Sequence, residues 1–205
     1  MEKIPHIVLD DCVAKNVIAA GIKYYLKDRA QWLNAYDEVA DWFADNRGRG
    51  LICTGPCGLG KSLICRDILP KLYRKHFGGQ LDVLTVAATE MVPRIDELLK
   101  FCRTKNIIVI DDLGTEAVEA WVNYRKRNPF CELVDKAEQT GTLLIITTNL
   151  FTTIPRLKMD CAYGRAGDLA PKLHPSIEQR YGIRTLDRLR AITSVVVFQG
   201  KSMRS

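Results

Sequence analysis

The sequence contains no uncharged apolar run that approaches the roughly 20 residues needed to span a bilayer. Residues 1–6 show no charged lead followed by an apolar stretch and a small-residue cleavage site, so no secretory signal is predicted. Internal repeats and low-complexity tracts are also lacking, which excludes a repeat array. These absences predict a soluble chain that works in the cytoplasm without membrane contact.

Paired cysteines at Cys-x-x-Cys spacing are absent as well. The seven cysteines form an odd set, at positions 12, 53, 57, 65, 102, 131 and 161. An odd set without that spacing argues against both a disulfide framework and a zinc site. Reduced thiols, as found in a cytoplasm, fit better.

What the chain does have is enough apolar sequence for a buried core. With 205 residues and 47% hydrophobic content, it suits one α/β domain. Its net charge of +6 is confined to one end: residues 151–205 carry ten Lys and Arg against four Asp and Glu, whereas residues 1–150 balance. This asymmetry indicates an anionic partner, either nucleic acid or a neighbouring subunit's nucleotide, although a solvated basic face would give the same pattern.

A phosphate-binding loop is the strongest motif. It reads Gly-x-x-x-x-Gly-Lys-Ser and consists of Gly55, Pro56, Cys57, Gly58, Leu59, Gly60, Lys61 and Ser62. An apolar strand pattern, residues 51–53, precedes it, and a helical pattern, residues 62–69, follows it, which is the setting that this motif requires. Glycines let backbone N–H groups turn toward phosphate oxygens at a helix start. We expect Lys61 to reach the β and γ phosphates and Ser62 to ligate Mg²⁺.

Two carboxylates follow the apolar run 107–110 directly. Such a run is typical of a strand buried on both faces of a parallel sheet, and its carboxyl end is where α/β sheets bind ligands. Asp111 lies 50 residues after Lys61 and is predicted to hold the Mg²⁺ shell through water, as a Walker B acid does. Asp112 is predicted to polarise the attacking water. The alternative is that both acids only cap a turn.

A third polar strand end is predicted at Asn149, after the apolar run 143–146. An asparagine there can position water near the γ phosphate, the role called sensor 1. It can also be an ordinary turn residue.

The remaining patterns predict helices and strands that alternate along the chain. Helices are expected at residues 13–45, with Asn34 as a cap inside that range, at 71–77 after a break at Pro70, and at 93–103, 128–139 and 177–191. Further strands are expected at 81–87 and 194–198, with a long loop at 150–175.

Together these motifs resemble the AAA+ superfamily, and within it the DnaC-like helicase loaders and IstB-like transposition helper ATPases. The resemblance is carried by the phosphate loop and by residues 111–116, 147–150, 180–189 and 200–204. It implies a P-loop NTPase of α/β class, with a five-stranded parallel sheet flanked by helices and no helical lid domain. The implied ATPase domain spans residues 35–205, behind a short helical extension, 1–34.

The resemblance also implies a nucleotide-dependent homo-oligomer, in which an arginine finger from one subunit completes the site of the next. Arg188 is the expected finger and Arg184 the second candidate. Glu116 is a possible substitute for Asp112 as the base. The expected ligands are ATP or ADP with Mg²⁺.

The implied partners are single-stranded DNA and a replicative helicase, in DNA replication. Residues 88–106 leave room for one ordinary helix where loaders insert an extra helical element that arranges single-stranded DNA. Two alternatives stay open: a transposition helper that delivers a transposase to DNA, and a nucleotide-switched interaction module with negligible turnover. The sensor and tail motifs argue against a small-molecule kinase.

Overall fold

The structure is a computed structural model that describes residues 6–103, 106–152, 175–200 and 202. Most of the predicted loop 150–175 and of the closing motif 200–204 lies outside these residues. Among the residues described, no helix is long and apolar enough to cross a membrane.

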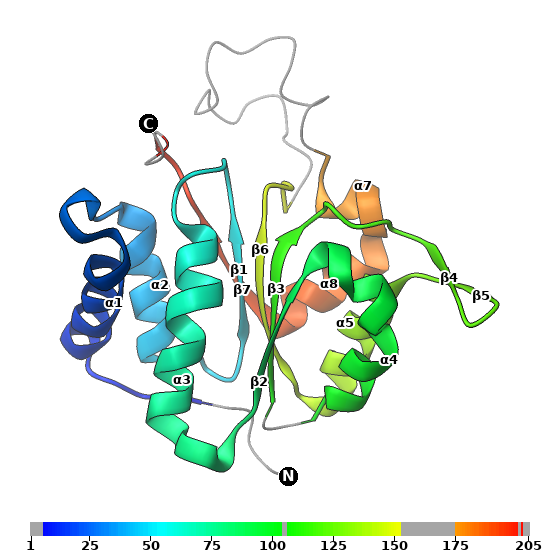
Figure 1. The fold of residues 1–205 in the computed structure, drawn as a ribbon, viewed down its shortest axis with the longest axis horizontal. Coiled ribbons are helices and arrows are strands. Elements are labelled where there is room, and N and C mark those ends of the chain that lie inside the picture. Colours follow the sequence, from blue (N-terminus) through cyan, green and yellow to red (C-terminus); the bar gives the residue numbers. More distant parts are fainter. Residues whose placement is uncertain (1–5, 104–105, 153–174, 201, 203–205) are drawn as a thin grey trace, which may run out of the picture.

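A five-stranded parallel sheet forms the centre of the described chain, as predicted (Figure 1). Its order is β2-β3-β6-β1-β7, with β1 (Gly50–Thr54), β2 (Val83–Ala87), β3 (Ile107–Leu113), β6 (Leu143–Thr148) and β7 (Thr193–Val197). Strands β1 and β6 are buried at every position, which is why their sequences contain uninterrupted apolar runs, 51–53 and 143–146, rather than alternation. All neighbours pair in parallel, so the carboxyl ends meet at one edge.

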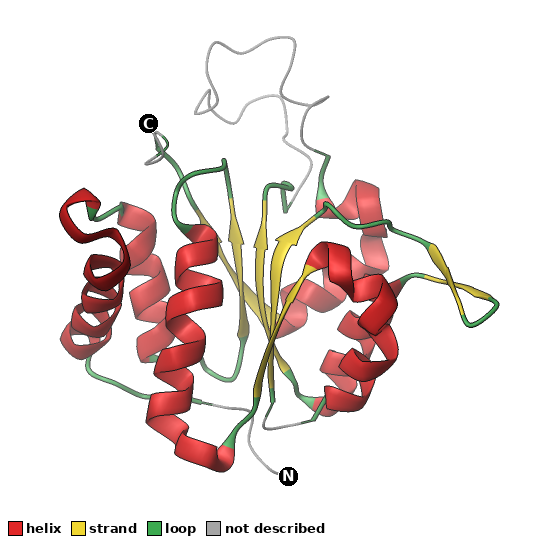
Figure 2. Cartoon of the chain, viewed as in Figure 1, coloured by secondary structure: helices red, strands yellow, loops and turns green. Residues whose placement is uncertain are grey.

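Helices cover both faces of the sheet (Figures 1 and 2). One face carries α1 (Asp11–Leu26), η1 (Lys27–Arg29), α2 (Asn34–Ala44), the π-helical turn η2 (Leu63–Ile68), α3 (Leu69–Phe77) and η3 (Gly78–Gln80). The other carries η4 (Ala88–Glu90), α4 (Met91–Phe101), α5 (Pro129–Thr140), α7 (Ile177–Tyr181) and α8 (Ile183–Ile192). A separate apolar core lies on each side. Helix α1 contributes Ile18 and Ile22 to the same core as β1, so it packs on the domain; the division at residue 34 stays a prediction.

Two local expectations differ from the structure. Asn34 is the first residue of α2 and not its cap, because the extended backbone that enters the helix belongs to Leu33. The helix expected over 177–191 is two helices, since Gly182 adopts a φ of 85° between them. The helix is divided near Pro70 as expected, because the π-helical η2 ends at Ile68 and α3 begins at Leu69 with Pro70 in its first turn.

A short antiparallel hairpin, β4 (Ala120–Val122) and β5 (Arg125–Arg127), is present where no strand was predicted. Its turn residues, Asn123 and Tyr124, both have positive φ angles, 51° and 62°. Tyrosine is an unusual residue at such a position, so the turn carries no sequence signal comparable to Asn-Gly.

Candidate functional site

The loop 55–62 connects β1 to η2 at the carboxyl edge of the sheet. Its path depends on glycine, as Gly55 and Gly58 show. Gly55 has a φ of 135°, and a side chain there would overlap the carbonyl oxygen of Phe198 beyond β7. Gly58 has a φ of 83°, and a side chain there would overlap the hydroxyl of Ser202. The loop therefore bends tightly against the end of the neighbouring strand, as a backbone phosphate cradle requires.

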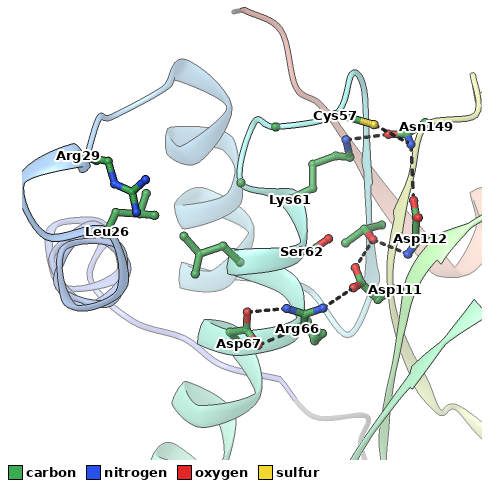
Figure 3. A pocket seen from close by; sticks show the side chains of 14 residues that line it. Leu26, Arg29, Cys57, Lys61, Ser62, Arg66, Asp67, Asp111, Asp112 and Asn149 are labelled. Carbon is green, nitrogen blue, oxygen red and sulfur yellow. Dashed lines mark hydrogen bonds and ion pairs between the residues drawn. The ribbon is translucent and has the colours of Figure 1, made fainter. Parts of the chain in front are cut away.

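A cavity of about 630 Å³ opens beside this loop (Figure 3). The predicted residues that line it are Cys57, Gly58, Gly60, Lys61, Ser62, Asp111, Asp112 and Asn149. Motifs from three separated segments thus meet in one place. The phosphate loop follows β1, the two acids lie at the carboxyl end of β3, and Asn149 follows β6. Gly55, Pro56 and Leu59 contribute backbone: the first two bind Lys61 through their carbonyls, and Leu59 accepts a hydrogen bond from Tyr36.

Several cavity residues were not expected from the motifs: Leu26, Arg29, Leu63, Arg66, Asp67 and Thr147. Leu26 and Arg29 come from the end of α1 and from η1, so the amino-terminal extension forms one wall of the cavity. No spacing rule connects these two residues to a phosphate loop some 30 residues later. Arg66 and Asp67 lie about one turn beyond Ser62 in the π-helical η2, so they return to the same side of the helix.

Lys61 is buried and turned onto its own loop. Its Nζ donates to the carbonyl oxygens of Gly55 and Pro56, both at 2.7 Å, and to Oδ1 of Asn149 at 3.0 Å. Burial lowers the pKa of this ammonium group. All three acceptors are neutral, so the positive charge is held by dipoles and not by a contacting carboxylate. Such a charge favours an incoming anion, and phosphate oxygens would relieve its desolvation.

Asp111 is held by a contact on each carboxylate oxygen (Figure 3). Its Oδ1 accepts a hydrogen bond from the Thr147 hydroxyl at 2.6 Å, and its Oδ2 accepts one from Nη1 of Arg66 at 3.0 Å. Arg66 also contacts both oxygens of Asp67, at 3.2 Å each. A metal cation at Asp111 would therefore compete with Arg66 for the same oxygen.

The donor set fits Mg²⁺. Ser62 and Asp111 line the same cavity and offer a hydroxyl and a carboxylate, which are hard oxygen ligands. Mg²⁺ in nucleotide sites is usually bound by one or two such groups together with phosphates and water. A cluster of three or more acidic, histidine or cysteine side chains is not found among the described residues, so a fully protein-built metal cage is not indicated there.

Asn149 connects the motifs. Its amide oxygen accepts from Lys61, and its Nδ2 lies 3.3 Å from Sγ of Cys57 and 3.5 Å from Oδ1 of Asp112. Asp112 is exposed and has a φ of 61°, an uncommon backbone conformation that Thr147 supports by accepting the Asp112 N–H at 2.8 Å. Asn149 and Asp112 therefore face the cavity together, as water-positioning groups should.

Glu116 does not reach this cavity. Its side chain is 1% exposed; Oε2 accepts the Gly114 N–H at 2.8 Å, and Oε1 accepts the Tyr181 hydroxyl. Arg180 lies 3.9 Å from the same oxygen. The expectation that Glu116 could substitute as the base is not supported, because the segment after β3 turns it inward beneath α7.

Comparison with known proteins agrees with this geometry. Residues 51–164 match the family model described as ATPase family associated with various cellular activities (AAA). The chain belongs to the AAA family. Its match with the replicative helicase loader DnaI of Bacillus subtilis is 24% identical over 96 residues, which is 44% of this chain and 29% of DnaI. The crystal structure of the DnaC helicase loader superposes with a TM-score of 0.57 and 17% identity, over 85% of this chain and 96% of that one.

These comparisons confirm a DnaC-like AAA+ fold and an ATPase-type domain. The family match ends before α8, the helix that carries both candidate finger arginines. The matched part of DnaI is less than a third of that loader, so the activity and partners of the whole relative are matters for proposal.

The two candidate finger residues of this AAA protein differ in their surroundings. Arg188 on α8 pairs with Asp135 and, at 3.1 Å, with Glu138, both on α5. Arg184, one turn earlier, is exposed and has no ion pair among the described residues. Neither residue lines the cavity of its own chain, which is what a residue that acts on a neighbour's nucleotide requires.

Replacing Tyr181 with phenylalanine is expected to lower the free energy of unfolding by about 1.5–3 kcal/mol, the usual cost of losing a hydrogen bond to a buried charge. The hydroxyl donates to the buried Glu116 carboxylate, and burial together with that carboxylate raises the pKa of Tyr181. Urea denaturation measures the change. Tyr124→Phe is the matched control: Tyr124 is 99% exposed and should lose nothing measurable. Equal stability of both variants would contradict the prediction.

Proposed function

We propose that this AAA protein binds ATP with Mg²⁺, hydrolyses it, and acts in DNA replication as a helicase-loader-like factor. The observation that carries the nucleotide part is the convergence at Asn149, which contacts Lys61 of the phosphate loop and faces Asp112 at the carboxyl end of β3. A phosphate-binding cation, a carboxylate and an amide arranged around one cavity are the groups that phosphoanhydride hydrolysis needs.

In the proposed hydrolysis, each group of cavity residues has a separate role. Backbone N–H groups of the glycine loop and the Lys61 ammonium hold the phosphates of ATP. Asp112 and Asn149 orient a water molecule for in-line attack on the γ phosphorus, and Asp112 accepts its proton as the bond to the β-phosphate oxygen breaks. Ser62 and Asp111 would hold Mg²⁺, which neutralises charge on the phosphates when bound.

Two contacts support a low turnover in the isolated subunit. Arg66 sits on Asp111, the proposed metal ligand, and Arg188, the proposed finger, is held by Asp135 and Glu138 of its own chain. Both contacts must open before the site is complete. We propose that nucleotide and assembly into a homo-oligomer open them together, so that hydrolysis is stimulated by assembly.

The partner proposal rests on two observations. The chain is similar to the replicative helicase loader DnaI in sequence and to the DnaC helicase loader in fold, and its excess positive charge is confined to residues 151–205. We propose a replicative helicase and single-stranded DNA as the partners, because a basic segment attracts phosphate backbones. A transposase partner has no such support from the comparisons.

Replacing Lys61 with alanine tests the nucleotide site. We expect ATP affinity to fall about 10- to 100-fold, since charge-assisted hydrogen bonds to phosphate are lost. Titration with a fluorescent ATP analogue, with and without Mg²⁺, measures the change. Lys71→Ala is the matched control, because that lysine is exposed on α3 and contacts Tyr25 outside the cavity. Unchanged ATP binding by the Lys61 variant would overturn the proposed site.

A further inference from the structure

The β4–β5 hairpin, residues 120–127, projects from the side of the molecule that carries α4 and α5 (Figures 1 and 2). It follows β3, whose carboxyl end carries Asp111 and Asp112, and precedes α5. The hairpin is not part of the sheet and does not border the nucleotide cavity. Neither the nucleotide site nor the core explains its side chains.

Two aromatic rings are presented to solvent on this hairpin. Tyr124 at the turn is 99% exposed, and Trp121 is 75% exposed. Trp121 pairs across the ladder with Lys126, and Arg125 follows Tyr124 directly. Two exposed aromatic rings are unfavourable on a surface that stays in water. Aromatic rings stack on nucleotide bases, and neighbouring cations attract the phosphates.

The hairpin is fixed on its supporting helices rather than left free. Arg127 binds the carboxylate of Glu132 on α5 through two nitrogens and that of Asp96 on α4 at 2.6 Å. Asn123 donates to the same Asp96 at 3.0 Å. These contacts hold the turn in place, so that stacking of a ligand on the rings would cost little conformational entropy of the hairpin.

The same contacts show which charges are available. Arg127 is neutralised by Glu132 and Asp96, and Lys126 lies 2.6 Å from Glu119. Arg125 is exposed and has no ion pair among the described residues. Aromatic surface therefore dominates at this hairpin, with one available cation beside it.

We infer that the hairpin is a stacking platform for single-stranded nucleic acid, with bases on Trp121 and Tyr124 and one phosphate at Arg125. A single strand fits because its bases are free to stack, whereas the faces of duplex bases are covered. One available cation is too few to hold a duplex or an anionic membrane by charge. That the strand is DNA rests on the proposed function; the hairpin chemistry itself applies to any single strand.

Binding of fluorescein-labelled oligothymidine, followed by fluorescence anisotropy with ATP present, tests the inference. Tyr124→Ala and Trp121→Ala are each expected to weaken binding by about 5- to 150-fold, the usual value for one base–aromatic stack. Tyr124→Phe and Trp121→Phe retain a ring and should retain most of the affinity. Tyr24→Ala is the matched control, because Tyr24 on α1 is equally exposed, at 75%, but lies outside the hairpin.

Salt dependence separates stacking from charge. Arg125→Ala should reduce the slope of log affinity against log salt by about 0.7, the contribution of one phosphate contact to a single strand. Tyr124→Ala should lower affinity and leave that slope unchanged. Quenching of tryptophan fluorescence by the oligonucleotide should vanish in Trp121→Phe, although Trp32 and Trp42 remain.

Equal binding by wild type and the two alanine variants would overturn the inference and leave DNA binding by another surface intact. No binding by wild type would overturn the inference together with the DNA part of the proposed function, while ATP binding by the same sample would show that the ATPase assignment stands. Loss of helicase capture with unchanged oligonucleotide binding would assign the hairpin to a protein partner and likewise overturn the inference.

Discussion

Replacing Asp112 with asparagine is expected to lower ATP turnover by the assembled protein about 10²- to 10⁴-fold, the usual contribution of a positioned general base. The amide keeps the size of the side chain and its approach to Asn149, but it cannot accept the proton of the attacking water. ATP affinity should change little, because Asp112 is exposed and Lys61 donates instead to the loop carbonyls and Asn149. The measurement is phosphate release under saturating ATP, with nucleotide binding determined on the same preparation.

The control for Asp112 is Asp67→Asn. Asp67 also lines the cavity but pairs with Arg66, away from the proposed water. We expect its turnover to stay within a few fold of wild type. Retention of full turnover by Asp112→Asn would exclude Asp112 as the base. Absence of turnover in the wild type under every condition, with ATP still bound, would support a nucleotide-switched module instead of an ATPase.

Replacing Arg188 with alanine is expected to lower assembly-stimulated turnover by about 10³- to 10⁵-fold, the range known for arginine fingers. The guanidinium is absent from the cavity of its own chain, so ATP binding by the isolated subunit should be unchanged. In the structure Arg188 is held by Asp135 and Glu138, and a finger role requires that assembly exchange these carboxylates for a neighbour's γ phosphate.

Mixing variants shows whether Arg188 acts between subunits. Arg188→Ala subunits retain Asp112, and Asp112→Asn subunits retain Arg188, so a mixed assembly contains complete sites and should regain activity. Arg184→Ala is the comparison, since Arg184 lies one turn away and is exposed without an ion pair among the described residues. Loss of activity in the Arg184 variant alone would move the finger to Arg184. Failure of mixing to restore any activity would count against a shared site.

The extent of sequence-based prediction can be judged at particular residues. The phosphate loop, Asp111, Asp112 and Asn149 were predicted, because each lies at or just after the carboxyl end of a buried apolar run and a parallel sheet gathers the strand ends. Glu116, the other predicted candidate for the base, lies outside the cavity for the opposite reason. Its position depends on how one turn packs beneath α7, and no periodicity records that.

The contacts to Asp111 illustrate what sequence patterns leave out. Arg66 and Thr147 both bind this carboxylate, yet they belong to a helix and a strand that are distant in the chain from Asp111. Leu26 and Arg29 reach the cavity only because α1 packs on the same core as the sheet. The hairpin turn at Tyr124 was missed because its backbone conformation is set by the anchors of Arg127 and Asn123 on neighbouring helices.

The sequence alone determined the α/β class, the strands and the nucleotide motifs, because burial on two faces demands continuous apolar runs and a phosphate loop demands glycines at set spacings. The tertiary structure decided which charges are engaged: Arg66 on Asp111, Arg188 on Asp135, Arg127 on Asp96. It also decided that Trp121 and Tyr124 face solvent. Ion pairs and exposure depend on distances between segments far apart in the chain, and those distances exist only once the layers have packed.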